Sequence, residues 1–385
     1  MNVSKLLIMI MKSIYTEINL VKMGKPKDNF DIINEQSVII FSHNSGGGTK
    51  TFVNNYIQNN HINKVYIIYP LSTTTKTKRF VVEDYNSNTC FTILPKNLIS
   101  FLNSLNDIEE LLINSLVECR DVLGIIDILI NFIKGKNINT ILMFHEFLPL
   151  CPNYTLTRNF KYCELNCLKN NCPDSKQYKI DEWRRKWLEL LTIVGEIRTF
   201  DESVKSMIKQ IYPEMNNITV IPHKLTHFTV SPIFNFNSKE MRIGVLGKIS
   251  KIKGKLFLKG FLKYLLSKKQ KIYLFGKSFL FSPNFIHTGV YDSKNLRDKL
   301  IKYKINVVLF TSICPETFSY VISELMALNI PIVCFNVGAQ ANRVKHYERG
   351  IVCQSMDYND VYNALLFCYK NYILDGKSDK ENETN

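Results

Sequence analysis

Short apolar runs alternate along the chain with stretches in which apolar residues recur every three or four positions. A run of four to eight apolar residues is typical of a buried strand, and the second spacing is typical of a helix that packs on one face. Residues 306–310 and 330–335 are apolar runs, and helical spacing extends between them from Phe318 to Leu325. This order predicts two parallel strands joined by a helical crossover.

The same alternation continues on both sides of this unit. It predicts strands at residues 37–41, 64–69, 90–94, 140–144, 196–200, 218–221, 241–247, 271–275 and 285–289. It predicts a helix after Gly48 and further helices at residues 107–133, 183–191, 202–211, 255–266, 293–302 and 361–373. We therefore expect an α/β protein with two similar halves, because the length allows two domains of ordinary size.

Two glutamates lie close to the helix of the central unit. Glu316 follows a strand at the edge where parallel sheets bind ligands, and Glu324 lies about 12 Å further on at ~1.5 Å per helical residue. The helix amino end at Thr317, Phe318 and Ser319 offers N–H groups to an anion. A diphosphate with hydroxyls on both sides, as in a nucleotide-sugar, suits this arrangement. Two solvated helix glutamates are the alternative.

Two other loops also have features of anion sites. Gly47 and Gly48 lie in a glycine-rich turn between a strand and a helix, where a ligand can approach the backbone; a plain tight turn is the alternative. Lys248 and Lys253 lie between the strand at 241–247 and the next helix. They predict a second anion site, with a solvated lysine run as the alternative.

The two glutamates also carry a resemblance to a known family. Glu316, Glu324 and the strand that begins at Asn329 resemble the signature of the retaining GT-B glycosyltransferases, family four in particular, with Asn329 where glycine is usual. The resemblance extends over about residues 37–373. It implies two Rossmann-like domains with parallel sheets and an inter-domain cleft. It also implies that Glu316 contacts the donor sugar and that Glu324 contacts the nucleotide ribose.

Other blocks extend this resemblance. It implies that Lys248 and Lys253 hold the donor diphosphate and that the loop of Gly47 and Gly48 faces the cleft. The stretch that begins at His145 resembles the "H-D-[YF]-x-x-[IV]-C-P" block of a bacterial branch, with glutamate in place of aspartate. In the family this histidine lies near the anomeric centre of the donor sugar. A histidine that caps a strand end is the alternative for His145.

Later landmarks of the same branch are also present. Trp183-Arg184 and Pro222-His223 match its "W-R" and "P-H" positions. Four cysteines match its cysteine cluster: Cys151, Cys163, Cys167 and Cys172. Four thiolates can form a tetrahedral structural zinc site. Free thiols, a disulfide or plain packing are the alternatives. No obligatory cofactor is expected, and the absence of an Asp-x-Asp motif favours a metal-independent reaction.

These observations predict the domain organisation. We expect an N-terminal helical segment, a Rossmann-like acceptor domain, a Rossmann-like donor domain, a crossover helix and a disordered tail. The helical segment comprises residues 1–30, the acceptor domain 31–223 and the donor domain 240–360. The crossover helix comprises residues 361–374 and the tail 375–385.

Composition limits the partners. The net charge of +15 favours an anionic partner, such as nucleotide phosphates, nucleic acid or an acidic membrane surface. Nucleic acid is not expected, because clustered aromatic and basic residues are not apparent. The apolar run at 6–11 is too short to span a bilayer. Ten cysteines without a signal peptide favour a reducing, cytoplasmic location, with peripheral membrane contact left open.

The expected function is transfer of a sugar from a UDP- or GDP-sugar to an acceptor hydroxyl, with retention of configuration. The acceptor is expected to be a glycan, a lipid-linked molecule or a protein. Two alternatives remain from the sequence. One is a nucleotide-sugar epimerase on the same fold, and the other is a non-catalytic basic protein that binds nucleic acid or a membrane.

Overall fold

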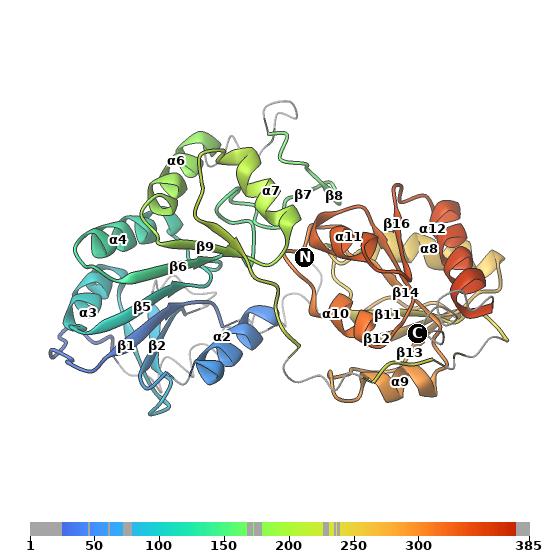
Figure 1. Ribbon diagram of the computed structural model, residues 1–385, viewed down its shortest axis with the longest axis horizontal. Helices are drawn as coiled ribbons and strands as arrows, with labels where there is room; N and C mark the ends of the chain where they lie inside the picture. The colour runs from blue at the N-terminus through green and yellow to red at the C-terminus, as the bar shows by residue number, and fades with distance from the viewer. Residues whose placement is uncertain are drawn as a thin grey trace, which may run out of the picture. The chain divides into compact units, whose positions relative to one another are not determined.

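The computed structural model describes residues 25–44, 47–60, 62–71, 79–167, 172, 179–225, 231–234, 236 and 239–374. The chain forms two units, which Figure 1 shows with their elements labelled. Unit 1 comprises residues 1–154, 172–199 and 208–220, and unit 2 comprises residues 155–171, 200–207 and 221–385. The predicted domain boundaries and the cleft stay predictions. The tail at 375–385 and residues 1–24 of the predicted N-terminal segment lie outside the described residues.

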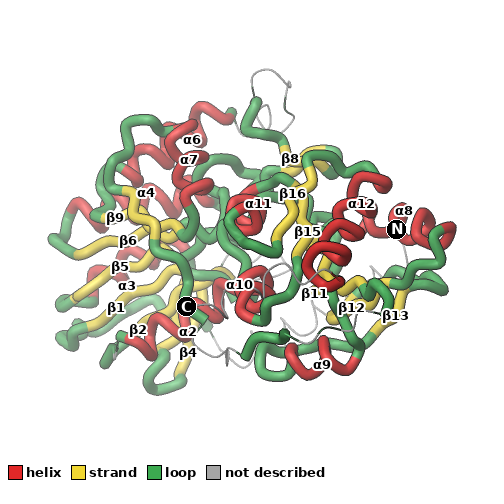
Figure 2. Tube along the Cα trace, turned by 45° about the vertical axis from the view of Figure 1, so that its right-hand side comes forward, coloured by secondary structure: helices red, strands yellow, loops and turns green. Residues whose placement is uncertain are grey.

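Unit 1 is built on an eight-stranded sheet of order β10-β9-β6-β5-β1-β2-β3-β4. Figure 2 shows β9, β6, β5, β1 and β2 as a yellow stack in this order. Neighbours from β10 to β2 are parallel, and β2, β3 and β4 pair antiparallel. The strands are β1 (Ser37–Phe41), β2 (Val65–Pro70), β3 (Phe80–Asp84), β4 (Thr89–Ile93), β5 (Ile108–Ile113), β6 (Asn139–Met143), β9 (Glu196–Thr199) and β10 (Ile218–Val220).

The helices around this sheet follow the apolar spacing of the sequence. They are α2 (Gly48–Asn59), α3 (Leu98–Ser104), α4 (Val122–Lys134) and α6 (Ile180–Leu191), with a 3-10 turn at Pro95–Asn97. Helix α7 (Glu202–Ile211) begins in unit 2 and ends in unit 1. In α4 the side chain of Asp121 accepts a hydrogen bond from Gly124 N at 3.0 Å. This satisfies one of the amide groups that a helix start leaves without an intrahelical partner.

The predicted helix at 107–133 is wrong in its first half. Residues 108–113, Ile-Glu-Glu-Leu-Leu-Ile, fit a helical spacing but form β5, and only α4 is helical. The reason lies in the sheet: Leu111 pairs with Ile39 of β1 on one side and with Thr140 of β6 on the other. A strand in this position buries both faces, so pairing overrides the local helical pattern. Strand β3 and helix α3 were not predicted.

Unit 2 is built on a six-stranded sheet of order β13-β12-β11-β14-β15-β16, in which all neighbours are parallel. The strands are β11 (Ile243–Lys248), β12 (Ile272–Lys277), β13 (Phe285–His287), β14 (Val307–Phe310), β15 (Ile332–Phe335) and β16 (Gly350–Cys353). The helices are α8 (Lys255–Ser267), α9 (Leu296–Lys302), α10 (Tyr320–Ala327), α11 (Gly338–Lys345) and α12 (Tyr358–Tyr369), followed by a π-helical turn at Lys370–Leu374. Strand β16 and helix α11 were not predicted.

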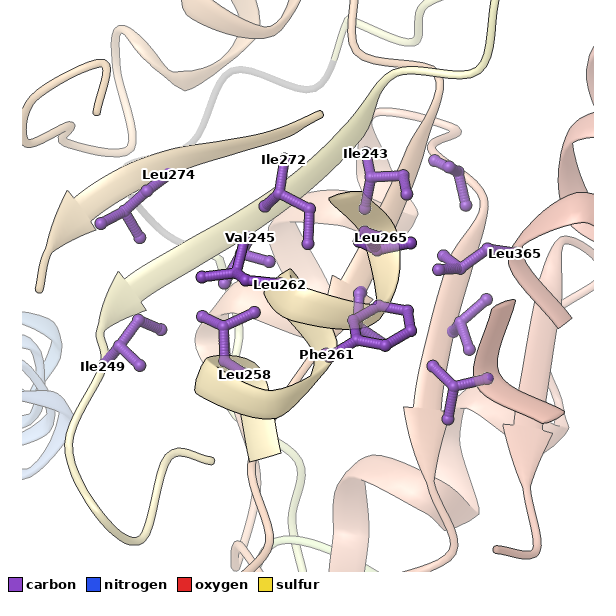
Figure 3. Packing of buried hydrophobic residues seen from close by; sticks show 14 of the residues in the cluster. Ile243, Val245, Ile249, Leu258, Phe261, Leu262, Leu265, Ile272, Leu274 and Leu365 are labelled. Carbon is purple, nitrogen blue, oxygen red and sulfur yellow. The ribbon is translucent and has the colours of Figure 1, made fainter. Parts of the chain in front are cut away.

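The two faces of this sheet carry separate apolar cores. Ile243 and Val245 of β11 face the first core with α8 and α12, whereas Leu246 faces the second core with α9 and α10. Figure 3 shows Leu258, Phe261, Leu262 and Leu265 of α8 pointing at the side chains of β11 and β12. Alternate residues of a strand therefore cover both faces, as in other parallel sheets with helices on either side. The predicted crossover of residues 361–374 to the first domain stays a prediction.

Candidate active site

The loops that follow β11 and β14 are joined at the carboxyl edge of the second sheet. Thr311 Oγ1 donates to the carbonyl of Lys253 at 2.8 Å, and Ile313 N donates to the carbonyl of Ile252 at 3.1 Å. Gly254 has a φ of +79°, and a Cβ there would lie 2.1 Å from the carbonyl oxygen of Thr311. Only glycine fits this close approach, so the Lys-Gly pair has a backbone reason as well as a chemical one.

This junction brings Lys253 and Glu316 together as an ion pair. The Nζ of Lys253 donates to Oε1 of Glu316, whose side chain is 14% exposed, against 39% for the lysine. Burial by itself lowers the pKa of Lys253. The charge of Glu316, the charge of Cys314 and the hydrogen bond to Glu316 together outweigh it and hold the pKa above its ordinary value. Glu316 is therefore neither helical nor solvated, and the alternative of two solvated helix glutamates is wrong.

Helix α11 fixes the backbone on either side of Glu316. The side chain of Gln340 is fully buried; its Oε1 accepts from Glu316 N at 2.9 Å and its Nε2 donates to the carbonyl of Cys314 at 2.8 Å. Gly338 has a φ of +59°, and a Cβ there would lie 2.6 Å from Cα of Pro315. Sequence reasoning did not identify Gln340.

Helix α10 begins at Tyr320, two residues after the predicted start at Phe318. Ser319 precedes it with a φ of 124° and does not cap the helix with its side chain. Arg343 of α11 donates to the carbonyl of Ser319 at 2.9 Å and to Ser323 Oγ at 2.7 Å. Strained backbone of this kind gathers at functional sites, and Arg343 stabilises it here. Sequence reasoning did not identify Arg343.

The guanidinium of Arg343 also lies over an aromatic ring. It is 4.1 Å from the centroid of Phe318, whose side chain is buried, as is that of Thr317. Burial lowers the pKa of Arg343, and the charge of Asp201 partly opposes this. The three residues predicted to present their amides, Thr317, Phe318 and Ser319, are thus held in one fixed turn at the start of α10.

Glu324 lies inside unit 2 and faces the loop between β13 and α9. Its side chain is 5% exposed, and its Oε1 accepts from the hydroxyl of Ser293. Burial raises the pKa of Glu324, and the hydrogen bond from Ser293 opposes this rise. Burial and the nearby charge of Glu324 also raise the pKa of Tyr291. The carboxyl of Glu324 and the hydroxyl of Ser293 therefore meet beside the carboxyl end of β13, near enough to Tyr291 for the charge to act on its phenol.

Lys248 ends β11 and is exposed. It is in register with Lys277, which ends the neighbouring strand β12. The two strands lie so close here that a Cβ on Gly276 would be 2.0 Å from the carbonyl oxygen of Gly247. Lys248 thus lies on the same sheet edge as Lys253 but outside the ion pair with Glu316.

His223 lies in an aromatic cluster beside α10. Its ring stacks on Phe200, with centroids 3.8 Å apart, and on Tyr320 at 5.2 Å. The ring of Phe318 meets it edge-on at 4.8 Å. Burial, together with the charge of Arg343, lowers the pKa of His223 to about 3. The histidine is therefore neutral near pH 7 and packs as an aromatic side chain.

In unit 1, His145 follows β6 at the carboxyl edge of the first sheet. Its ring meets Phe52 of α2 edge-on, with centroids 4.8 Å apart. Helix α2 begins at Gly48, and Gly47 before it has a φ of 77° with no atom within 4 Å of an added Cβ. The structure thus brings the helix of the glycine-rich turn and His145 together within this unit.

Glu146 lies next to His145 and accepts a hydrogen bond from Ser115 Oγ at 2.8 Å. Burial raises the pKa of Glu146 to about 8, and the bond from Ser115 limits the rise. The loop that follows Ser115 borders a cavity of about 330 Å³, lined in part by Glu118, Tyr154 and Trp183. The loop after β5 was predicted to be helical, so sequence reasoning missed both Ser115 and Glu118.

The "W-R" landmark anchors the segment that follows His145. The indole Nε1 of Trp183 donates to the carbonyl of Leu148 at 2.9 Å, and Arg184 Nε donates to the carbonyl of Leu150 at 3.1 Å. The hydroxyl of Tyr212 donates to the carbonyl of Pro149 at 2.7 Å. Two side chains of α6 and one from the residue that follows α7 therefore satisfy carbonyl groups of a buried loop that forms no sheet pairs.

The predicted zinc site is not assembled. Among the described residues, which include all four cysteines, no group of three or more His, Cys, Asp or Glu side chains is arranged to hold a metal ion. The segment folds instead around the short pair β7 (Thr157–Arg158) and β8 (Lys161–Tyr162), with Leu156 and Leu165 buried. Cys151 is buried, and the other three cysteines of the predicted cluster are partly buried.

Comparisons with known proteins agree with this geometry. Residues 255–383 match the family model of the glycosyl transferases group 1. Sucrose-phosphate synthase from Thermosynechococcus elongatus is similar in structure, with a TM-score of 0.56 at 14% identity over 86% of this chain and 89% of that one. HepE from Anabaena, solved in complex with UDP, gives 0.56 at 11% identity over 88% and 91%. The fold is that of the GT-B glycosyltransferases.

A third GT-B structure is similar over almost the whole chain. The catalytic domain of starch synthase IV from Arabidopsis thaliana, bound to ADP and acarbose, gives a TM-score of 0.52 at 11% identity over 91% of this chain and 93% of that one. No curated protein sequence matches the chain. The predicted GT-B fold with two mainly parallel sheets is confirmed. The predicted roles of the individual site residues stay predictions.

Proposed function

We propose that this protein is a retaining glycosyltransferase that transfers a sugar from a nucleotide-sugar donor to an acceptor hydroxyl. The observation that carries the proposal is the joined pair of loops at the carboxyl edge of the second sheet, where Lys253, Glu316 and the start of α10 meet. The match of residues 255–383 to the glycosyl transferases group 1 model supports the same assignment.

The donor is proposed to lie on unit 2 with its diphosphate beside the start of α10. Lys253 and Lys248 supply positive charge, and the amides of the turn at Thr317 and Phe318 supply aligned dipoles. Both stabilise a leaving diphosphate as the bond to the sugar breaks. Lys253 is ion-paired with Glu316 in the structure, so the donor phosphates would share a lysine that is already held in place.

The two glutamates are proposed to hold the ends of the donor. Glu316 accepts hydrogen bonds from hydroxyls of the sugar, and Glu324 accepts them from the ribose. Glu324 is suited to this role because its carboxyl is buried and its described hydrogen bond comes from a neutral hydroxyl. A charge-assisted hydrogen bond from a ligand hydroxyl is stronger than a neutral one.

The acceptor is proposed to lie on unit 1 at the edge that carries His145 and Glu146. Burial keeps Glu146 protonated near pH 7, so it can donate to an oxygen of a sugar as well as accept. His145 is proposed to lie near the anomeric centre of the donor sugar. The glycine-rich turn of Gly47 and Gly48 lets a ligand approach the backbone. The acceptor is proposed to be a glycan, a lipid-linked molecule or a protein.

The test compares nucleosides with their diphosphates. Isothermal titration with UDP, GDP, ADP and the matching nucleosides identifies the donor nucleotide, and release of sugar from the matching nucleotide-sugar measures turnover. Lys253→Ala is expected to weaken binding of the diphosphate at least tenfold and to leave the weaker nucleoside binding within about twofold, since a hydrogen bond to a charged group contributes roughly 1.5–3 kcal/mol. Lys345→Ala, which removes an exposed lysine of α11, is the control.

Two results would remove the proposal. One is that no nucleoside diphosphate binds. The other is that nucleoside and diphosphate lose equal affinity in Lys253→Ala, which would mean that this lysine does not contact phosphate. Lys253→Arg keeps the charge and checks that the loss does not come from an unpaired Glu316.

A further inference from the structure

One stretch of unit 2 is basic throughout. Residues 241–291 contain ten lysines and one arginine, and no aspartate or glutamate. Lys248 and Lys253 belong to the candidate active site, but most of the others lie on α8 or beside it. The donor phosphates therefore account for only a small part of this charge. The stretch differs from the chain as a whole because no acidic residue within it offsets this charge.

Helix α8 presents lysines and leucines together on its outer side. Its inner side packs into the core through residues such as Leu258 and Phe261, as Figure 3 shows. The outer stripe has the spacing of one helix face and consists of Leu256, Lys259, Lys263 and Leu266. The two leucines are each 45% exposed. An outer face with leucines set among lysines differs from the wholly polar face that a solvated helix usually presents.

The loop after β12 adds two aromatic side chains to this surface. Phe279 is 82% exposed and Phe281 is 86% exposed. The loop itself is fixed: Leu280 between them is buried in the same core as α8, and Asn284 Nδ2 donates to the carbonyl of Leu262 at 3.0 Å. Two nearly fully exposed phenylalanines on a held loop are therefore a feature of the fold rather than of a loose end.

Direct contacts join this loop to α8. The ammonium of Lys255 lies 5.8 Å from the ring centroid of Phe279. On the other side, Phe281 stacks on His287 of β13, with centroids 5.7 Å apart and planes 12° apart. We call the outer stripe of α8 together with Lys255, Phe279 and Phe281 the α8 surface. Sequence reasoning found no cluster of aromatic and basic residues, and the structure corrects this.

We propose that the α8 surface binds an anionic lipid bilayer. Phenylalanine and leucine insert into the headgroup and acyl boundary, and lysines around them are attracted to acidic headgroups. The leucines decide between a bilayer and a nucleic acid, since single-stranded nucleic acids are held by stacking on aromatic rings and aliphatic side chains offer no such platform. In the described part of the chain, no helix is long and apolar enough to cross a bilayer, so the contact is peripheral.

Flotation of the full-length protein with lipid vesicles tests the proposal. The vesicles contain phosphatidylcholine alone or phosphatidylcholine mixed with phosphatidylglycerol, at low and at high salt. Binding is expected to the mixed vesicles and to weaken as salt rises, because screening shortens the range of the attraction. No donor or acceptor is added, so the outcome is independent of the proposed transferase reaction.

Two double variants separate the apolar and electrostatic contributions. Phe279→Ala with Phe281→Ala and, separately, Lys259→Glu with Lys263→Glu are each expected to lower the affinity for mixed vesicles at least about tenfold. Phe234→Ala is the matched aromatic control, because Phe234 is also an exposed phenylalanine but lies outside this surface. The charge control is Lys294→Glu with Lys302→Glu, at α9, which packs on the opposite face of the sheet. Both controls are expected to bind within about twofold of the wild type.

Several outcomes would overturn the proposal. Absence of vesicle binding, or equal binding to neutral and anionic vesicles, would do so. Equal loss in the two charge variants would mean that net charge acts without a defined surface. A protein that ignores vesicles but binds a single-stranded oligonucleotide through the same phenylalanines would identify nucleic acid as the partner. Melting curves verify that each variant is folded.

Discussion

The buried carboxyls of the two sheet edges differ in what balances their charge. Glu316 meets the ammonium of Lys253, whereas the hydrogen bonds described for Glu324 and Glu146 come from the hydroxyls of Ser293 and Ser115. A hydroxyl balances a buried charge less well than a cation does, and burial raises the pKa of both these carboxyls. Such perturbed groups gather at functional sites, which agrees with the roles proposed for them.

Replacement of Glu324 tests the ribose contact. Glu324→Gln keeps the size of the side chain and can still accept from Ser293, but it removes the charge. We expect nucleotide affinity in calorimetry to fall about tenfold, since a hydrogen bond to a charged group contributes roughly 1.5–3 kcal/mol. Glu348→Gln, at an exposed position of the same unit, should change nothing. An unchanged affinity in Glu324→Gln would show that this carboxyl does not contact the nucleotide.

Glu146 should make the stability of the protein depend on pH. Its pKa rises from 4.5 to about 8 on folding. Below about pH 4.5 both the folded and the unfolded chain hold the proton; between about 4.5 and 8 only the folded chain does, so the free energy of unfolding decreases as the pH rises. One pKa unit corresponds to about 1.4 kcal/mol, so the loss amounts to a few kcal/mol at most.

Urea titrations of the wild type and Glu146→Gln across this pH range measure the effect. The glutamine variant cannot ionise here, so its stability relative to the wild type should increase from pH 5 to pH 8 and then level off. A constant difference between the two proteins would mean that Glu146 is already ionised at pH 5 in the folded chain.

The bounds of a helix or strand could be predicted from the local sequence pattern where the element is amphipathic or flanked by turns. Helix α7 begins and ends as predicted, and β1 does as well. The pattern failed at β5, whose Glu109 and Glu110 interrupt the apolar run that a buried strand usually shows. It also failed at α11, where Gln340 and Arg343 are polar but turn inward to hold backbone carbonyls. Tertiary hydrogen bonds decide both cases, and a sequence pattern does not contain them.

The close approach of the two loops in unit 2 predicts that alanine substitutions at two of its glycines lower stability by different amounts. Gly254 and Gly247 both have positive φ, but a Cβ on Gly254 would lie 2.1 Å from the carbonyl of Thr311, whereas a Cβ on Gly247 meets no atom within 4 Å. Gly247→Ala should therefore cost only the backbone strain, about 1–2 kcal/mol. Gly254→Ala adds overpacking of roughly 1–3 kcal/mol and pushes the two loops apart.

Denaturant unfolding compares the two variants directly. Gly254→Ala should also lose nucleotide affinity, because Lys253 moves with its loop, whereas Gly247→Ala is expected to keep it. Equal stability of the two alanine variants would contradict the close approach of the loops.

For the whole molecule, the motifs identified the candidate site residues but not the side chains that hold them in position. Lys253, Glu316 and Glu324 were found from spacing and resemblance. The residues that hold them, Ser293 and Gln340, are distant from them in sequence and belong to loops or helices of no distinctive pattern. The fold class followed from the repeated order of strands and helices, because parallel strands with helical crossovers allow few arrangements.

The separation of the chain into two units leads to a prediction about ligand protection. Each unit has its own sheet, and the proposed donor contacts from Lys248 to Glu324 lie in unit 2. A ligand that binds only the native state stabilises it by about 2.7 kcal/mol at a concentration of 100 Kd. Hydrogen exchange with and without saturating nucleoside diphosphate should therefore slow in β11, β14 and α10. Exchange in β1, β5 and β6 of unit 1 should change little. Lys253→Ala at the same ligand concentration should remove most of the added protection. Equal slowing in the strands of both units would place the nucleotide elsewhere or couple the two sheets into one cooperative unit.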